Sequence, residues 1–447
     1  MGDGHLRLIN QRLKAHGKIA LLLFLCSLIV YLSNWRTLSS GDTQPASLLP
    51  ILVMTKRTLD FSEFVPYYHE HHISAYFFRR TDRGYISTYP LATGFLALPI
   101  YAIPVLWCQA FSHPSTEEWV KFGFYMQKVS AAIITSLAIY IFYFLSLELG
   151  ASEIVSVVLS LAFAFGTEAW STASQALWMH APGLLFVTAS TLVAVRHVKV
   201  PQWRTAVLAG LCCGVTAAIR LNLVLFVVPL LGWMFWKERR YFFAALVAAG
   251  LPIGILLVYN LAYFGSFVGS YENRFDQPIL VGLACVLFTP GRGLVIYFPL
   301  SLFALLGLIT ALQRKDANRS LYVALCVFVI GILLLTAKWN QWHGGLCFGP
   351  RLLTESEPIL LLMTIPVCND LHRVRGGLAL KLLFVLLFAW SVGVQYLGAF
   401  RQSTWDADLL KAGNELPRRW WDWIDSPISR AVTAPGVQGS WSTFRSY

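Results

Sequence analysis

The sequence predicts an all-α protein that crosses a membrane many times. Hydrophobic residues make up 56% of the 447 residues and charged residues only 13%, whereas a soluble domain carries about 25% charged residues. Thirteen apolar runs follow one another along the chain, and several approach the ~20 residues that cross a bilayer as a helix. Together these observations exclude a water-soluble globular protein.

The net charge of +12 is explained by membrane topology. Basic residues collect in the cytoplasmic loops of membrane proteins, so the excess does not indicate a nucleic-acid partner. Four basic clusters lie between the apolar runs, at 196–204, 237–240, 313–319 and 372–381. We expect all four on the cytoplasmic side, together with the basic N-terminal flank.

The four clusters share one side only if two apolar runs do not cross the membrane. The first is 91–111, where Pro99 and Pro104 break or kink a helix, so we expect a helical hairpin or an interfacial segment embedded from the outer side. The second is the short run 279–289. About 11 transmembrane helices remain, at 18–34, 122–148, 153–167, 181–197, 204–219, 221–236, 241–264, 294–312, 321–337, 352–369 and 379–399.

This topology divides the chain into a transmembrane domain, residues 1–400, and a short extracytoplasmic tail, residues 401–447. The first outer loop, 35–121, is long and is expected to carry interfacial helices. Nearly all the unusual polar motifs fall in the outer loops. A functional site is therefore expected on the extracytoplasmic face.

Three of the acids in the first outer loop are candidate site residues. Asp42 directly follows the first span, in a Ser-Gly-Asp sequence typical of a turn or a helix cap; a site residue at the membrane face is the alternative. Asp60 and Glu63 are spaced three apart on one helix face, where they are either helix N-terminal acids or substrate contacts. Tyr89 follows in a polar turn that precedes an apolar helix.

Three polar side chains stand beside later apolar runs. His180 shares a membrane face with Asp42 and is either a hydrogen-bonded structural residue or part of a site. Arg220 lies between two apolar stretches, where an arginine either faces an interior or cavity with an anionic partner or snorkels at a helix end. Arg292 lies between two glycines, an arrangement that suits either the close approach of a phosphate or a tight turn.

The densest polar motif is AKWNQWHGGLCFGPR, residues 337–351. It combines Lys338, His343 and Arg351 with two tryptophans, one of them Trp342. Its glycines permit tight turns and close contacts. A plain connecting loop needs none of these residues, so the motif indicates a functional site.

The eight cysteines lie mostly inside apolar runs and include no C-x-x-C pair. Such cysteines are typically small buried hydrophobes rather than metal ligands or a disulfide framework. They predict no metal site.

The order of these motifs resembles the GT-C superfamily of polyprenyl-phosphate-sugar-dependent glycosyltransferases, which includes protein O-mannosyltransferases and aminoarabinose lipid transferases. The resemblance covers the chain to about residue 400 and is greatest for bacterial members with W-x-G-G-x-x-x-G-P-R in a late outer loop, here Trp342-His343-Gly344-Gly345 through Gly349-Pro350-Arg351. In that superfamily an acid just after the first span is the proposed base or acceptor-binding residue, and Asp42 occupies its position. Thr43 follows in place of a second acid, which speaks against a metal-dependent variant.

The resemblance implies a GT-C-like bundle and a hexosyl- or pentosyltransferase. The enzyme would move a sugar, with inversion, from a polyprenyl-phosphate donor to a lipid, protein or glycan acceptor at the outer face of the cell membrane, without a cofactor. Asp42 would be the base and a set of cations would bind the donor phosphate: Arg220, Arg292, Lys338 and Arg351. The expected substrate contacts are His180, His343, Trp342, Tyr89, Asp60 and Glu63.

A lipid-linked glycan flippase or another transporter is the alternative function. Transporters of this kind typically have interrupted helices and polar residues near the bilayer midplane. In this sequence the polar motifs gather at one membrane face instead, which favours chemistry at the membrane surface.

Overall fold

The computed structural model describes residues 3–270, 274–345, 347–370, 377–401 and 419–433. Within these ranges the chain is helical apart from one two-stranded hairpin. The helices are α1 (Asp3–Leu32), α2 (Gln44–Lys56), α3 (Val65–Glu70), α4 (Ala92–Phe111), α5 (Thr116–Glu148), α6 (Glu153–Gly166), α7 (His180–Lys199), α8 (Trp203–Ile219), α9 (Val224–Lys237), α10 (Phe242–Phe264), α11 (Ile279–Phe288), α12 (Leu294–Tyr297), α13 (Ser301–Gln313), α14 (Arg319–Lys338), α15 (Glu357–Met363), α16 (Ile365–Asp370), α17 (Gly377–Phe400) and α20 (Pro427–Thr433). Short helical turns are η1 (Gly41–Thr43), η2 (Ala169–Ala173), η3 (Leu221–Leu223) and η4 (Arg351–Ser356), and the strands are β1 (Phe78–Thr81) and β2 (Gly84–Ser87).

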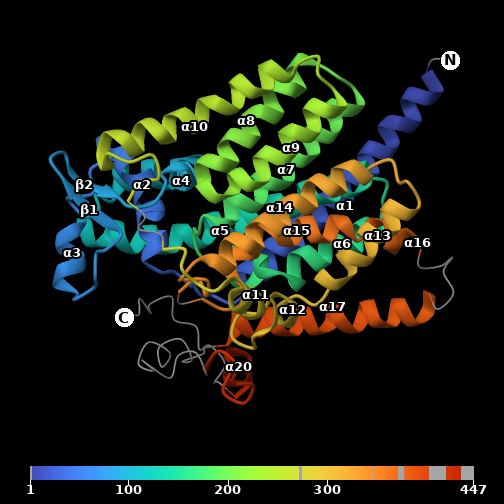
Figure 1. The fold of residues 1–447 in the computed structure, drawn as a ribbon. Helices are drawn as coiled ribbons and strands as arrows, with labels where there is room; N and C mark the ends of the chain where they lie inside the picture. Colours follow the sequence, from blue (N-terminus) through green and yellow to red (C-terminus); the bar gives the residue numbers. More distant parts are fainter. Residues whose placement is uncertain (1–2, 271–273, 346, 371–376, 402–418, 434–447) are drawn as a thin grey trace.

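The bundle has two distinct ends (Figure 1). At one end, Glu148 at the end of α5 accepts hydrogen bonds from Arg196 and Lys199, at 3.0 and 2.9 Å. Asn318, before α14, donates to the carbonyl of Leu149 at the same end, at 3.0 Å. We call this the basic end, because the described members of the clusters at 196–204 and 313–319 meet there.

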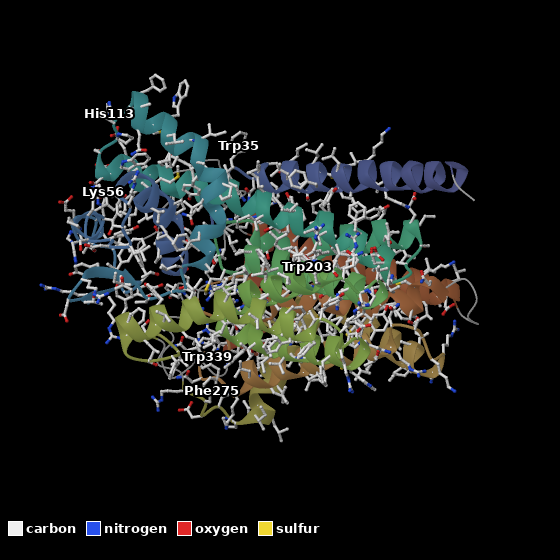
Figure 2. All side chains as sticks on the ribbon, turned by 90° about the horizontal axis from the view of Figure 1, so that it is seen from above. Trp35, Lys56, His113, Trp203, Phe275 and Trp339 are labelled. Atoms are coloured by element: carbon white, nitrogen blue, oxygen red, sulfur yellow. The ribbon has the colours of Figure 1, made fainter. Side chains whose placement is uncertain are left out.

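The opposite end carries the first outer loop and is called the site end. The hairpin of β1 and β2, with α2 and α3, projects beyond the bundle there (Figure 1). Figure 2 shows Lys56, Phe275 and Trp339 toward this end, with Trp203 at the start of α8 farther along the molecule. Segments distant in sequence also meet there, since Asn34 donates to Gln175 and to the carbonyl of Ala399.

In the part of the chain that the structure describes, six helices are long and apolar enough to cross a membrane: α4, α5, α7, α10, α14 and α17. Shorter apolar helices complete the bundle. Eleven segments of the described chain coincide with the predicted spans: α1, α5, α6, α7, α8, α9, α10, α13, α14, the run from η4 to α16, and α17. The number of segments that cross the membrane, and the side that each end faces, stay predictions.

Helix α4 differs from one expectation. It is a single continuous helix of 20 residues that contains Pro99 and Pro104, so the expected helical hairpin is wrong. Both of its ends nevertheless lie at the site end, because α5 begins there and its 33 residues span ~50 Å to the basic end. The interfacial alternative therefore stays a prediction. The 10-residue α11, ~15 Å long, is too short to cross a bilayer by itself.

Small residues allow the helices to approach closely. A Cβ built on Gly210 of α8 would lie 2.0 Å from the carbonyl oxygen of Ala245 in α10, and one on Gly214 would lie 2.3 Å from that of Ala249. Spacing of small residues by four is a common means of packing helices in membranes. The same packing brings the end of α10 over the site described next.

Candidate active site

An ion pair lies at the centre of the site. It joins the first outer loop to the loop that carries the motif of residues 337–351, which is called the late loop below. The Arg351 Nη1 donates to Asp42 Oδ2 at 2.8 Å, although the residues are 309 positions apart. Tyr89 donates its hydroxyl to Asp42 Oδ1 at 2.7 Å. The side chains of Arg351 and Asp42 are only 12% and 18% exposed, so the pair is largely shielded from water but still reachable.

Local structure places Asp42. Ser40 caps the short turn η1 by accepting a hydrogen bond from the amide of Asp42, at 3.2 Å, as serine commonly does at a helix start. The first nine residues of α2 are buried, so this turn is held against the bundle. The turn predicted at Asp42 is therefore present, and it also aims the carboxylate at Arg351.

Local structure also explains the Gly-Pro-Arg sequence that places Arg351. Gly349 has a φ of +78°, and a Cβ there would lie 2.0 Å from Glu168 Oε1. Only glycine fits both the left-handed backbone and the space beside this carboxylate. Pro350 then leads into η4, whose first residue is Arg351.

The electrostatics of the pair favour its charged form. Burial raises the pKa of the Asp42 carboxyl, but the charge of Arg351 and hydrogen bonds from Tyr89 and Arg351 outweigh burial and leave the pKa below its ordinary value. Burial lowers the pKa of the Arg351 guanidinium, but the negative charge of Asp42 outweighs burial and leaves this pKa above its ordinary value. The guanidinium also lies 4.4 Å from the ring centroid of Trp178, a cation–π arrangement.

The pair borders a cavity of about 1080 Å³. Its polar wall includes Asp42, Tyr89, His180, Arg220 and Arg351. Its apolar wall comes from the end of α10, the segment after it and α14, and includes Leu256, Tyr259, Phe264, Val268, Phe275 and Leu335. The cavity thus offers charge at one wall and an apolar surface at another, in a volume at the upper end of ordinary ligand sites.

A second ionic group lies beside the pair. Arg220 Nη1 donates to Glu355 Oε2 at 2.7 Å, and His180 Nδ1 lies 3.0 Å from Glu355 Oε1. Arg220 is 8% exposed. The structure therefore decides between the two explanations of Arg220: the arginine has a buried anionic partner, and the snorkelling alternative is wrong.

The two arginines of the first outer loop that precede the hairpin turn also reach the cavity. Arg79 and Arg80 line it, and the Arg79 guanidinium lies 5.8 Å from the ring centroid of Phe264. Arg83 makes a similar contact with Tyr263 at 5.7 Å. The hairpin is thereby held against the end of α10.

Arg292 has a different position from the one expected. Its side chain is 1% exposed and donates to the carbonyls of His343, Gly291 and Gly345 at 3.2, 2.9 and 3.2 Å. It does not line the cavity among the described residues. Its guanidinium supports the late loop from behind instead of facing a donor phosphate.

The Trp342–Gly345 part of the late loop divides between the cavity and the interior. Gly344 and Gly345 line the cavity, whereas Trp342 and His343 are not among its described lining residues. Burial, with the charges of Arg292 and Arg351, lowers the pKa of His343 to about 4. His343 is half-buried and stacks on Trp420 outside the described cavity lining, so its expected contact with the substrate stays a prediction.

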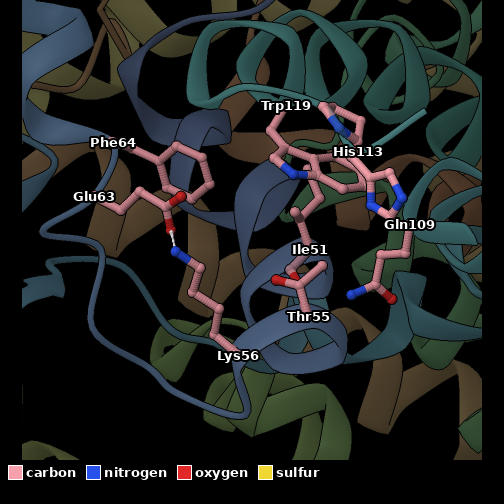
Figure 3. A pocket seen from close by; sticks show the side chains of 9 residues that line it. Ile51, Thr55, Lys56, Glu63, Phe64, Gln109, His113 and Trp119 are labelled. Carbon is pink, nitrogen blue, oxygen red and sulfur yellow. Dashed lines mark hydrogen bonds and ion pairs between the residues drawn. The ribbon is translucent and has the colours of Figure 1, made fainter.

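Three other expected site residues lie away from the cavity. Asp60 Oδ1 accepts from the amides of Ser62 and Tyr85, both at 2.9 Å, and ties the loop to β2. Glu63 pairs with Lys56 at 2.5 Å and lines a separate pocket of about 300 Å³ (Figure 3). Lys338, at the end of α14, is exposed and outside the described cavity lining. None of the three is positioned to contact a substrate held beside Asp42.

Sequence reasoning missed two acids of this region. Glu355 lies in the apolar run after Arg351, where an ionisable residue is itself a signal of a buried functional partner. Glu168 is 0% exposed, accepts from Thr172 and Ser171 at 2.7 and 3.1 Å, and has a pKa that burial raises to about 7. Its signal was weaker, because it stood in a loop with no motif.

Metal binding receives no support from side-chain clustering. Within the described ranges, no group of three or more His, Cys, Asp or Glu side chains could hold a metal ion. Chemistry without a metal or cofactor stays a prediction.

Comparison with solved structures finds a likeness of fold. No protein-family model matches the chain, and no curated protein does. The chain is similar in fold to ArnT from Cupriavidus metallidurans. That crystal structure has undecaprenyl phosphate bound; the match covers 92% of this chain and 74% of that chain, at 12% identity and a TM-score of 0.47.

Proposed function

We propose that the protein is a membrane glycosyltransferase that moves a hexosyl or pentosyl group from a polyprenyl-phosphate donor to a hydroxyl of a lipid, protein or glycan acceptor. The observation that carries this proposal is the Asp42–Arg351 pair at the wall of a cavity that is polar on one side and apolar on another. A carboxylate and a guanidinium in contact supply a proton acceptor and a phosphate-binding cation in one place. The apolar wall suits the first isoprene units of the donor.

The proposed reaction is a single displacement with inversion. The acceptor oxygen attacks the anomeric carbon while the bond from that carbon to the phosphate oxygen breaks. The acceptor proton passes to Asp42, and the polyprenyl phosphate leaves with the electron pair of the broken bond. Arg351 stabilises the negative charge that develops on the leaving oxygen, since a fixed cation in a partly shielded site acts more strongly than one in water.

Competition between donor and carboxylate for Arg351 completes the mechanism. Arg351 Nη1 is engaged by Asp42 in the structure, and the attraction of that cation holds the pKa of Asp42 low, which makes Asp42 a weak base. A phosphate that draws the guanidinium away raises the basicity of Asp42. Donor binding therefore prepares the base.

Two neighbouring cations assist in the proposal. Arg220 lines the cavity and is held by Glu355 at 2.7 Å, so it adds positive potential from a fixed position. Arg79 reaches the cavity from the hairpin and is a second source of positive potential. Arg292 and Lys338 are left out of the phosphate site because neither lines the cavity within the described residues.

Orientation in the membrane follows from charge. The positive-inside rule places the basic end in the cytoplasm, together with the N-terminus. The site end then faces the outside, and the donor lies in the outer leaflet with its sugar beside Asp42.

Sugar transfer in proteoliposomes tests the proposal. Purified protein would receive synthetic polyprenyl-phosphate hexose and pentose donors with pools of lipid, glycan and peptide acceptors, and release of polyprenyl phosphate with a new glycosidic product would be measured. We expect transfer with at least one donor and its loss in Asp42→Asn. Asp60→Asn is the matched control, because Asp60 serves the hairpin outside the cavity lining. Movement of intact donor across the bilayer without a new bond would favour a flippase, and full activity of Asp42→Asn would remove the proposed base.

A further inference from the structure

The described part of the tail, residues 419–433, forms a small folded unit. Asp425 pairs with Arg419 at 3.1 Å and with the guanidinium of Arg430, whose Nη2 donates at 2.9 Å. Ser426 accepts from the amide of Ser429 at 3.2 Å at the start of α20. These contacts close the segment on itself, so it can hold a defined shape against the bundle.

This unit packs on the back of the late loop through Trp420. The Trp420 side chain is 4% exposed, and its ring stacks on His343 at 5.1 Å with an interplanar angle of 28°. Trp342 contacts the same ring at 4.9 Å, and the Arg292 guanidinium lies 5.6 Å from its centroid. Trp420 is not part of the described cavity lining.

The late loop needs such support because its backbone is permissive. Gly344, Gly345 and Gly349 all have positive φ, at +73°, +75° and +78°. Glycine loses more conformational freedom than other residues when it is ordered, so a loop with three such positions is costly to hold in one shape. The loop nevertheless ends in Arg351, whose position against Asp42 carries the proposed chemistry.

We propose that residues 419–433 form a clasp that holds the late loop in its active shape, with Trp420 as a positioning residue. Trp420 fixes His343 and Arg292 by stacking, and Arg292 fixes the backbone of the loop through the carbonyls of His343 and Gly345. The fixed backbone of the late loop in turn sets the position of Arg351. The effect on catalysis rests on the proposed function, whereas the effect on the loop does not.

Alkylation of Cys347 tests the clasp without any substrate. Cys347 is 9% exposed, and its Sγ lies 3.7 Å from each of the carbonyl oxygens of His343, Gly345 and Gly349. We expect Trp420→Ala to raise the alkylation rate of this cysteine about tenfold, measured by peptide mass spectrometry. Trp423→Ala is the matched control, because Trp423 belongs to the same segment but is 60% exposed, and it should leave the rate unchanged.

Two further variants keep the test decisive. Trp420→Phe retains an aromatic ring and should restore most of the protection of Cys347, which a nonspecific loss of stability would not explain. Asp425→Asn loosens the clasp without touching the loop and should expose Cys347 as Trp420→Ala does. In transfer assays, Trp420→Ala should raise the KM for the donor while Trp423→Ala leaves it unchanged.

The outcomes separate the two proposals. Unchanged alkylation of Cys347 in both Trp420→Ala and Asp425→Asn would overturn the clasp, as would an equal rise in Trp423→Ala. If the wild type transfers no sugar from any donor, the proposed function fails, and the alkylation rates still decide whether the clasp holds the loop.

Discussion

Removal of the Arg351 charge is the sharpest test of the central pair. Arg351→Gln would leave the Asp42 carboxylate without its cation at a side chain only 18% exposed. Breaking a buried ion pair on one side costs about 3–5 kcal/mol, and the residual exposure reduces this to about 2–4 kcal/mol through screening. Tyr89 continues to donate to Asp42 at 2.7 Å, which keeps the loss within that range. The expected loss of catalysis is about 10²- to 10³-fold in kcat, because a preorganised charge is removed from the leaving group.

A double-mutant cycle separates the pair from general damage to the loop. Reversible unfolding in detergent would be measured for Arg351→Gln, Asp42→Asn and the double variant. The double variant has no uncompensated charge, so we expect it to be more stable than Arg351→Gln by about 1–3 kcal/mol while remaining inactive. Simple additivity of the two losses would refute the coupling, and normal stability and activity of Arg351→Gln would refute the role of the pair altogether.

Three further predictions concern other parts of the structure. Burial raises the pKa of the Glu168 carboxyl to about 7 from an ordinary 4.5. This carboxyl therefore loses its proton at a lower pH in the unfolded chain than in the folded protein, and the free energy of unfolding should fall as pH rises from about 4.5 to about 7. Glu168→Gln should flatten this slope when unfolding is measured across that pH range. Gly349→Ala combines a φ of +78° with a Cβ 2.0 Å from Glu168 and should lower the free energy of unfolding by about 2–4 kcal/mol. Gly345→Ala has nothing within 4 Å of its Cβ and should lower it only by the backbone strain of about 1–2 kcal/mol. Equal losses in the two variants would contradict the steric argument. Gly210→Ala should destabilise the protein because its Cβ meets a carbonyl of α10 at 2.0 Å, whereas Gly250→Ala, which has open space, should be neutral or stabilising by up to about 1 kcal/mol; thermal unfolding of the two variants checks this.

The membrane bundle was predictable because its signals are local. Apolar runs and basic clusters are read along the chain, and the rule that basic loops share one side predicts that 91–111 and 279–289 do not cross. The hairpin expected within 91–111 was wrong because Pro99 and Pro104 are accommodated inside a continuous helix. A helix packed beside neighbours can tolerate proline, and sequence alone does not show those neighbours.

The site was only partly predictable, for a related reason. Asp42, Tyr89, His180, Arg220 and Arg351 were recognised by residue type and position, and the structure brings them to one cavity. Other candidates with equally suggestive sequence contexts, Arg292 and His343, face the interior of the late loop and support it instead. Which way a side chain points within a glycine-rich loop depends on contacts with distant segments, and these leave no local pattern.

The sequence by itself determined that the chain is an apolar helical bundle. It also determined which loops carry the basic clusters and which loops concentrate the other polar residues, since hydropathy and charge act residue by residue. Only the tertiary structure decided that Arg351 meets Asp42 across 309 positions, that Arg220 has Glu355 as its partner, and that Trp420 of the tail supports the late loop. Ion pairs and ring stacking act over a few ångströms. Only folding brings residues so far apart in sequence within that range.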